Sequence, residues 1–293
     1  MGRLAVVLPP AGAALTGPPT APEVRRLLAA HGLAPHKRRG QNFVVDPNTV
    51  RAMVRRADVR AGDVVAEIGP GLGALTLALV EAGARVVAVE VDAGLVRALA
   101  EVLADSPEVQ VVHADAAEVE WKALVGAGPA KLVANLPYHM ATGLVLHALE
   151  SDVFERLEVM VQREVGERWA ARQGDDRYSG TSVKVAAYAS AVVDGRVSRH
   201  AFLPEPAVDS VTVRLEPRPW QAAVPRSELV RLVDVGFQQR RKRLRNALAT
   251  DACPPSRVET ALQRAGLDPG SRAEELDLAA WTRLADALAT SGR

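Results

Sequence analysis

Apolar residues follow two different periods along the chain. Between residues 63 and 172, short apolar runs of strand length alternate with segments in which apolar positions recur every three or four residues, as on one face of a helix. The runs that predict strands are 64–68, 85–89, 109–112, 131–134 and 157–161, and the segments that predict helices are 74–82, 93–103, 142–150 and 164–172. Because strands that alternate with helices form parallel sheets through right-handed crossovers, this region predicts an α/β fold.

The pattern changes on both sides of this region. Two further strand-like runs, 183–189 and 210–215, follow without a clear long helix between them, which predicts an antiparallel end to the sheet. The strand signals stop around Pro217, Pro219 and Pro225. Amphipathic helices are predicted before the sheet at 22–32 and 47–57, and after it at 227–249, 256–265 and 273–289.

These elements divide the chain into three parts. Residues 1–20 are rich in Ala, Pro and Gly, and their prolines interrupt the apolar helix that a signal peptide needs, so we expect a disordered leader. Residues 21–218 form a first domain, within which 21–60 is an N-terminal helical segment. Residues 219–293 form a small helical domain.

Composition narrows the class of protein without identifying it. A net charge of +1 does not by itself indicate a nucleic-acid-binding protein. Evidence for nucleic-acid binding must therefore come from the positions of the basic residues. The single cysteine, Cys253, excludes an internal disulfide and any multi-cysteine metal site, and the six histidines show no ligand spacing. No run approaches the roughly 20 apolar residues of a membrane helix. We therefore expect a cytoplasmic protein with no metal and no membrane contact.

Three strand ends carry residues suited to a nucleoside. The turn Gly69-Pro70-Gly71-Leu72-Gly73 has the spacing G-x-G-x-G, which is neither the G-x-G-x-x-G of dinucleotide sites nor a P-loop, so a nicotinamide dehydrogenase is disfavoured. Glu90, at the end of the next strand, can accept both hydroxyls of a ribose, and Asp115, after the third, can accept from the amino group of adenine. Either acid alone could instead cap a helix. Together they indicate a nucleoside held without phosphates, and the candidate is S-adenosylmethionine.

The fourth strand run ends abruptly in Asn135, Leu136, Pro137 and Tyr138. Pro137 cannot continue a central strand because it lacks an amide hydrogen, so the chain leaves the sheet there. Ligands of open parallel sheets bind at the carboxyl ends of the strands, which makes this turn a candidate site. An ordinary turn with a buried tyrosine is the alternative.

Two basic stretches could contact phosphates. The first is Lys37, Arg38 and Arg39, although three charges alone favour a solvated linker. The second lies in the predicted helix 227–249, where Phe237, Leu244 and Leu248 share an apolar face. Its basic residues are Arg240, Arg241, Lys242, Arg243 and Arg245. So few acids lie near this second stretch that we expect it to bind RNA phosphates.

Seven motifs occur together in an order that resembles a known family. They are Gly40-Gln41-Asn42-Phe43, Glu67 to Gly73, Glu90, Asp115, Asn135 to Tyr138, Phe202 to Ser210, and Phe237 to Asn246. Across about residues 20 to 250 the chain resembles the small-subunit ribosomal RNA adenine dimethyltransferases, which methylate N6 of two adjacent adenosines in the 3′-terminal hairpin of 16S rRNA.

The resemblance implies a fold, a cofactor and a set of contacts. It implies a Rossmann-like class I methyltransferase domain that uses S-adenosylmethionine, a helical C-terminal domain, a role in small-subunit biogenesis and a monomeric protein. The implied cofactor contacts are Asn42, Val44, Gly69, Gly71, Glu90, Asp115 and Asn135. The chain departs from the family pattern at His139 and Gly143, where relatives usually have Asn and Pro, so the shape of that loop is less predictable.

The residues after the fourth strand suggest how N6 becomes reactive. The side-chain oxygen of Asn135 and the carbonyl of Leu136 would accept its two hydrogens and turn its lone pair toward the methyl group, while Pro137 fixes the backbone. Tyr138 would stack on the extruded base. Phe202 is expected on the other face of the base through the resemblance alone, and core packing explains it equally well.

Two other functions stay open. The large-subunit (23S) rRNA adenine methyltransferases of macrolide resistance share the fold, the cofactor and the target atom. The chain could also act mainly as an assembly factor of the small subunit, with methylation secondary.

Overall fold

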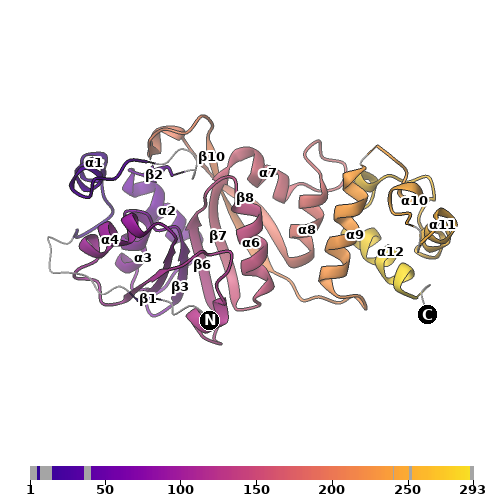
Figure 1. The fold of residues 1–293 in the computed structure, drawn as a ribbon, viewed down its shortest axis with the longest axis horizontal. Helices are drawn as coiled ribbons and strands as arrows, with labels where there is room; N and C mark the ends of the chain where they lie inside the picture. The colour runs from indigo at the N-terminus through magenta and orange to yellow at the C-terminus, as the bar shows by residue number, and fades with distance from the viewer. Residues whose placement is uncertain (1–4, 7–14, 36–40, 240, 251–252, 291–293) are drawn as a thin grey trace. The chain divides into compact units, whose positions relative to one another are not determined.

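The computed structural model describes the chain except for residues 1–4, 7–14, 36–40, 240, 251–252 and 291–293 (Figure 1). Contacts within the chain define two compact units. The first unit comprises Met1–Gly166 and Val192–Pro217, and the second comprises Glu167–Ala191 and Arg218–Arg293. Residues 167–191, which the sequence pattern assigns to the first domain, thus belong with the C-terminal helices.

An eight-stranded mixed sheet forms the centre of the first unit, in the order β1-β5-β4-β3-β6-β7-β10-β8. Its strands are β1 (Ala5–Val6), β3 (Val64–Ile68), β4 (Arg85–Glu90), β5 (Val109–His113), β6 (Ala130–Asn135), β7 (Phe154–Gln162), β8 (Ala189–Val197) and β10 (Ser210–Pro217). The strands β5, β4, β3, β6 and β7 run parallel, whereas β10 pairs antiparallel with β7. The predicted parallel sheet is therefore confirmed, and so is the antiparallel strand predicted at 210–215.

A small second sheet lies beside the first in the same unit. It pairs β2 (Phe43–Val44) with β9 (Phe202–Leu203) in antiparallel register, so that Val44 lies opposite Phe202. This pairing joins the loop before the main sheet to a segment more than a hundred and fifty residues later, which no local pattern predicts.

Two helices of the first unit start at acidic caps. The helices of this unit are α1 (Ala21–Ala30), α2 (Pro47–Arg56), α3 (Ala74–Glu81), α4 (Ala93–Val102), α5 (Trp121–Val125) and α6 (Ala141–Glu150), with a 3₁₀ turn at Arg199–Ala201. A further helix, α7 (Arg163–Ala170), begins in the first unit and continues into the second after Gly166. Asp46 accepts from the amide of Asn48 at the start of α2, and Asp92 accepts from Gly94 and Leu95 at the start of α4. Capping by these acids fixes where each helix leaves the loops at the strand ends.

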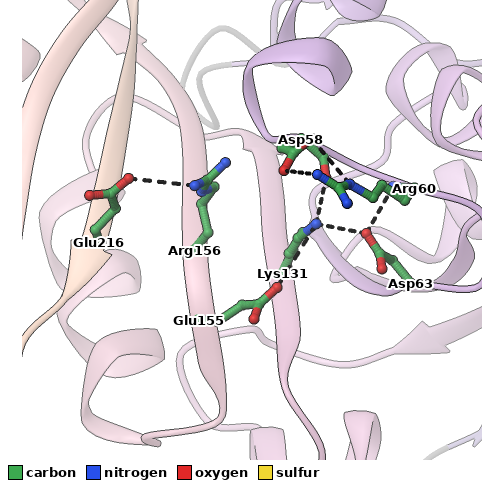
Figure 2. A network of polar contacts seen from close by, with 7 residues as sticks. All are labelled: Asp58, Arg60, Asp63, Lys131, Glu155, Arg156 and Glu216. Atoms are coloured by element: carbon green, nitrogen blue, oxygen red, sulfur yellow. Dashed lines mark hydrogen bonds and ion pairs between the residues drawn. The ribbon is translucent and has the colours of Figure 1, made fainter.

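A buried lysine stabilises the start of β6. Asn135 lies at the other end of the same strand. The ammonium of Lys131 donates to the carbonyl of Asp58 and to the carboxylate of Asp63, the latter at 2.7 Å, and it lies 3.9 Å from Glu155 (Figure 2). Lys131 is only 7% exposed, so its charge is compensated by these neighbours. Arg156 pairs with Glu216 on the neighbouring strands in the same view.

The leader is not disordered throughout. Ala5 and Val6 pair antiparallel with β5, where Ala5 lies opposite His113. The amide of Leu15 donates to the carbonyl of Val102, and residues 15–20 lead into α1. The prediction of a disordered leader is therefore wrong for these described residues.

The second unit is helical, and its first helix corrects a prediction. It contains α8 (Gly180–Tyr188), α9 (Arg226–Gln238), α10 (Leu244–Ala247), α11 (Pro255–Arg264), a 3₁₀ turn at Ala273–Glu275 and α12 (Leu278–Thr290). The strand predicted at 183–189 is wrong, because these residues lie in α8 apart from Ala189, which begins β8. Since α8 is buried on most sides, apolar residues do not mark a single face, and the alternation of Val183, Val185 and Ala187 resembles a strand.

The helix predicted at 227–249 is two shorter helices. α9 ends at Gln238, and the amide of Lys242 then donates to the carbonyl of Gln239 in a turn. Arg243 pairs with Arg272, and the amide of Leu244 donates to the carbonyl of Ser271. The basic residues therefore do not form the continuous helical stripe that was predicted. Phe237 turns inward and stacks on the buried Trp281, with the ring centres 6.0 Å apart.

Candidate active site

One cavity in the first unit opens at the carboxyl ends of the parallel strands β3, β4 and β6. Its wall includes every predicted cofactor residue and most of the predicted catalytic ones. These are Asn42, Val44, Gly69, Gly71, Glu90, Asp115, Asn135, Leu136, Pro137 and Tyr138. Parallel strands bring their carboxyl ends to one edge, so residues that follow different strands share this cavity.

The glycine turn after β3 presents backbone to the cavity. Gly69, Gly71 and Gly73 have φ angles of 68°, 58° and 82°, a region that strongly favours glycine. A Cβ atom on Gly69 would meet nothing within 4 Å, whereas one on Gly71 would lie 3.2 Å from the ring of Phe43. The open space over Gly69 leaves room for a ligand to approach the main chain.

A buried carboxylate ends β4. Glu90 is 5% exposed and accepts from the amides of Gly71, at 3.2 Å, and Asp92, at 2.9 Å. Burial raises the pKa of Glu90, and the two amide hydrogen bonds oppose this rise. Its oxygens have further lone pairs, so the group can accept hydrogen bonds from hydroxyls in the cavity.

A second buried acid lines the cavity, and the sequence predicts no role for it. Glu67 on β3 is 1% exposed and accepts from the hydroxyl of Thr76 at 2.7 Å. Burial raises its pKa to about 8, and the charge of Glu90 adds to the rise. An acidic residue inside the otherwise apolar run 64–68 was the available signal, since such a residue is costly to bury without a purpose.

Asp115 lies two residues after β5 and is half-buried. One of its carboxylate oxygens accepts from the amide of Ala117 at 2.9 Å, which fixes the side chain in a tight turn. Its position in the cavity wall agrees with the predicted place of an acceptor, and its contact with an adenine amino group stays a prediction.

The amide of Asn135 has a defined orientation at the end of β6. Its nitrogen donates to the carbonyl oxygen of Asn42 at 3.1 Å. Because a carbonyl can only accept, the atom facing Asn42 must be the NH₂ group, and the side-chain oxygen is left as the acceptor. The amide of Leu136 donates to the carbonyl of Met160, and the amide of Met140 donates to the carbonyl of Pro137, so the backbone of this turn is fixed on both sides.

Tyr138 is tethered through its hydroxyl. The oxygen lies 2.8 Å from the hydroxyl of Ser210, a residue 1% exposed at the start of β10. Burial raises the pKa of Tyr138, so the phenol is neutral over the physiological range. The half-buried ring lines the cavity, where it can offer a face to an aromatic ligand.

The other predicted site residues lie elsewhere. Phe202 is 4% exposed and packs in the core cluster that contains Val44, and it does not line the cavity. Lys37, Arg38, Arg39 and Arg240 lie outside the described residues. In the second unit, Arg241, Lys242 and Arg243 are exposed, and Arg245 is 3.5 Å from Glu259.

The described residues contain neither a metal site nor a membrane-spanning helix. No group of three or more His, Cys, Asp and Glu side chains there could hold a metal ion. Among the helices described, none is long and apolar enough to cross a membrane.

The sheet order, the glycine turn after β3 and the acid that ends β4 define a class I methyltransferase fold. Two solved structures share it. A dimethyladenosine transferase from Plasmodium falciparum matches with a TM-score of 0.72 and 23% identity, over 85% of this chain and 98% of that one. The 23S rRNA methyltransferase ErmE matches with a TM-score of 0.63 and 29% identity, over 85% of this chain and 100% of that one.

Residues 33–290 match the family model described as ribosomal RNA adenine dimethylase, and the chain belongs to this family. It is 46% identical over 281 residues to the ribosomal RNA small subunit methyltransferase A of Streptomyces coelicolor, which covers 93% of this chain and 96% of the relative. It is 47% identical over 274 residues to the protein of the same name from Leifsonia xyli subsp. xyli, with 90% and 96% covered. The family and the fold class predicted from the sequence motifs are thus confirmed.

Proposed function

We infer that the protein methylates N6 of two adjacent adenosines in the 3′-terminal hairpin of 16S rRNA, with S-adenosylmethionine as the methyl donor. The observation that carries this inference is a cavity in which the glycine turn, Glu90 and Asp115 meet the turn from Asn135 to Tyr138. Relatives named for the small subunit, at 46% and 47% identity over almost the whole chain, support the choice of rRNA.

The charge of the cavity supports this donor. None of the described lining residues is Lys or Arg, whereas Glu67, Glu90 and Asp115 are all acids. A dinucleotide or triphosphate would be repelled there, while a nucleoside that carries a sulfonium cation is suited to it. We propose that Glu90 accepts from the ribose hydroxyls, that Asp115 accepts from the adenine amino group, and that Gly69, Gly71, Asn42 and Val44 shape the rest of the site. When bound, S-adenosylmethionine supplies an electrophilic methyl group.

Asn135 and Leu136 would activate the acceptor nitrogen. The lone pair of adenine N6 is delocalised into the ring, which makes it a poor nucleophile. Hydrogen bonds from its two hydrogens to the Asn135 side-chain oxygen and the Leu136 carbonyl would draw the nitrogen toward tetrahedral geometry. Such positioning contributes on the order of several kcal/mol and requires no general base. The hydrogen bond to Asn42 sets the Asn135 oxygen in the accepting position in advance.

The target base would stack on Tyr138. Stacking of a base on an aromatic ring contributes roughly 1 to 3 kcal/mol, and the tether to Ser210 restricts the ring before the base arrives. A contact of Phe202 with the other face of the base requires that its ring leave the core position it occupies here. That contact stays a proposal from the family resemblance.

Basic residues of the second unit would bind the rRNA backbone. The exposed side chains of Arg241, Lys242 and Arg243 can pair with phosphates. We propose the same for Lys37, Arg38, Arg39, Arg240 and Arg245. We further propose that the protein acts as a monomer on the small ribosomal subunit in the cytoplasm.

Mapping of the modified nucleosides tests the proposed function. The wild-type protein is incubated with labelled S-adenosylmethionine and, separately, with small and large subunits that lack the modification. Two adjacent dimethyladenosines near the 3′ end of 16S rRNA are expected. Label in 23S rRNA would support the macrolide-resistance type of activity, with which the ErmE similarity is compatible. Rescue of subunit assembly by a methylation-dead variant would support the assembly role.

A further inference from the structure

Two residues of the cavity wall come from a part of the chain that the family model does not match. Pro19 and Val24 line the cavity, whereas the match begins at residue 33. We refer to residues 15–33, which contain α1, as the strap. The predicted cofactor contacts include no residue of the strap, because its sequence carries no motif of nucleoside chemistry.

The strap is anchored to the first unit by packing. Val24, Leu27 and Leu28 of α1 are at most 7% exposed and belong to the core cluster that also contains Phe43 and Leu72. A Cβ atom on Gly94 would lie 2.6 Å from the side chain of Leu33, so the strap approaches the start of α4 closely. This packing places α1 against the same residues that border the glycine turn.

Polar contacts add to this anchoring. The ring of His31 lies 2.8 Å from the carboxylate of Glu101 on α4, and Arg26 lies 3.8 Å from the same carboxylate. Before α1, Thr20 and Glu23 form a capping box, in which both the amide and the hydroxyl of Thr20 donate to Glu23, at 2.7 and 2.6 Å. The capping box fixes the direction of the chain one residue after Pro19.

Pro19 is suited to an apolar wall. It is buried, and it has no backbone amide that would need a hydrogen-bond partner at the edge of a cavity. An apolar wall keeps water away from a bound nucleoside, and this strengthens the hydrogen bonds to Glu90 and Asp115 on the other walls.

We propose that the strap is a wall of the cofactor site and that Pro19 determines how tightly the methyl donor and its demethylated product are held. This inference rests on the proposed function, since it concerns the same cavity. It adds a residue outside the matched family region to the residues that bind the cofactor.

The test compares two prolines of the strap. Pro19→Asn places a neutral polar group in the wall, and Pro22→Asn makes the same change at an exposed position of α1 that does not line the cavity. The measurement is the Kd of S-adenosylhomocysteine by titration calorimetry, with Tm as the check on folding. We expect Pro19→Asn to raise Kd about tenfold and Pro22→Asn to leave it within about twofold of the wild type.

Steady-state kinetics separate a wall from a general loss of folded protein. Pro19→Asn should raise KM for S-adenosylmethionine and leave kcat at saturating donor near the wild-type value, because the RNA side of the site is unchanged. A folded Pro19→Asn protein with wild-type Kd and KM would overturn the proposal. If Pro19→Asn does not fold, Pro19→Ala takes its place, with an expected rise of about threefold in Kd, and no rise would overturn the proposal.

A failure of the proposed function is distinguishable from a failure of the wall. If the wild-type protein binds neither S-adenosylmethionine nor S-adenosylhomocysteine, the proposed function is wrong and the wall has no cofactor to hold. If the wild type binds both ligands and the two asparagine variants bind S-adenosylhomocysteine as tightly as the wild type, only the proposed role of Pro19 is wrong.

Discussion

A single hydrogen bond decides what Asn135 can do. The carbonyl of Asn42 holds the NH₂ group of Asn135, so the oxygen of the amide is the atom that can accept. The sequence could predict that Asn135 ends a strand beside a proline. It could not predict the partner, because Asn42 lies 93 residues earlier and its carbonyl carries no residue-specific signal. The same holds for Tyr138, whose tether to Ser210 crosses 72 residues.

Glu158 makes stability depend on pH. This residue of β7 is fully buried, and burial raises its pKa from 4.5 to about 8, with nearby Asp194 adding to the rise. Because the folded protein holds this proton more tightly than the unfolded chain, the resulting stability is fully present below about pH 4.5. It is lost as pH rises through about 8.

We expect Glu158→Gln to stabilise the protein by about 1 to 3 kcal/mol at pH 8.5 and to change little at pH 5. The neutral amide keeps the shape of the protonated acid and cannot ionise. Urea unfolding at a series of pH values measures the effect. Glu67 titrates in the same pH range, so the free energy of unfolding of the variant still depends on pH, with a smaller slope. An equal change at both pH values would contradict the assignment of this pH dependence to Glu158.

At the scale of elements, the sheet was predictable where each strand is a short apolar run closed by a turn. The strands β3 to β7 and the turn at Gly69 follow this rule, and so the carboxyl edge that carries the site could be located. α8 could not be predicted because it is buried on most sides, and the end of α9 depends on pairing with residue 272. Burial therefore explains the first error, and pairing with a distant segment explains the second.

Lys131 links two elements, because its side chain joins β6 to the loop before β3. Lys131→Met removes the ammonium group that donates hydrogen bonds to the carboxylate of Asp63 and to the carbonyl of Asp58 (Figure 2). Both acceptors then lose this hydrogen bond. We expect a loss of about 1 to 3 kcal/mol in the free energy of unfolding. Because the site lies at the other end of β6, kcat should stay near the wild-type value at a temperature where the variant is folded. Unfolding in urea and a methyl-transfer assay measure the two effects, and a lost kcat in fully folded protein would contradict this separation.

At the scale of the whole molecule, a net charge of +1 conceals an uneven distribution. The cavity of the first unit is lined by acids, and the stretch from Arg241 to Arg243 in the second unit is basic and exposed. The sequence predicted a basic segment here, but the continuous helix predicted for it was wrong. That prediction extended the helical periodicity of the residues before the basic segment into the segment itself. An exposed turn still presents its side chains to a phosphate backbone.

Replacing Arg241, Lys242 and Arg243 with Ala should weaken RNA binding most at low salt. Each lost phosphate contact is expected to reduce the slope of log K against log salt by roughly 0.7 to 0.9. Filter binding of an rRNA hairpin over a salt series measures this slope. Arg231→Ala, an exposed basic residue on α9, is the control and should leave it unchanged. A loss of binding that is independent of salt would indicate misfolding instead.

The central claim is that the turn after β6 orients adenine N6 for methylation. Its most direct test is the transfer of labelled methyl from S-adenosylmethionine to small subunits that lack the modification, measured for the wild type and for Asn135→Ala. We expect two dimethyladenosines near the 3′ end of 16S rRNA with the wild type. With Asn135→Ala we expect no transfer, while S-adenosylmethionine still binds measurably. Full transfer by Asn135→Ala, or an unlabelled 16S rRNA with the wild type, would contradict the account.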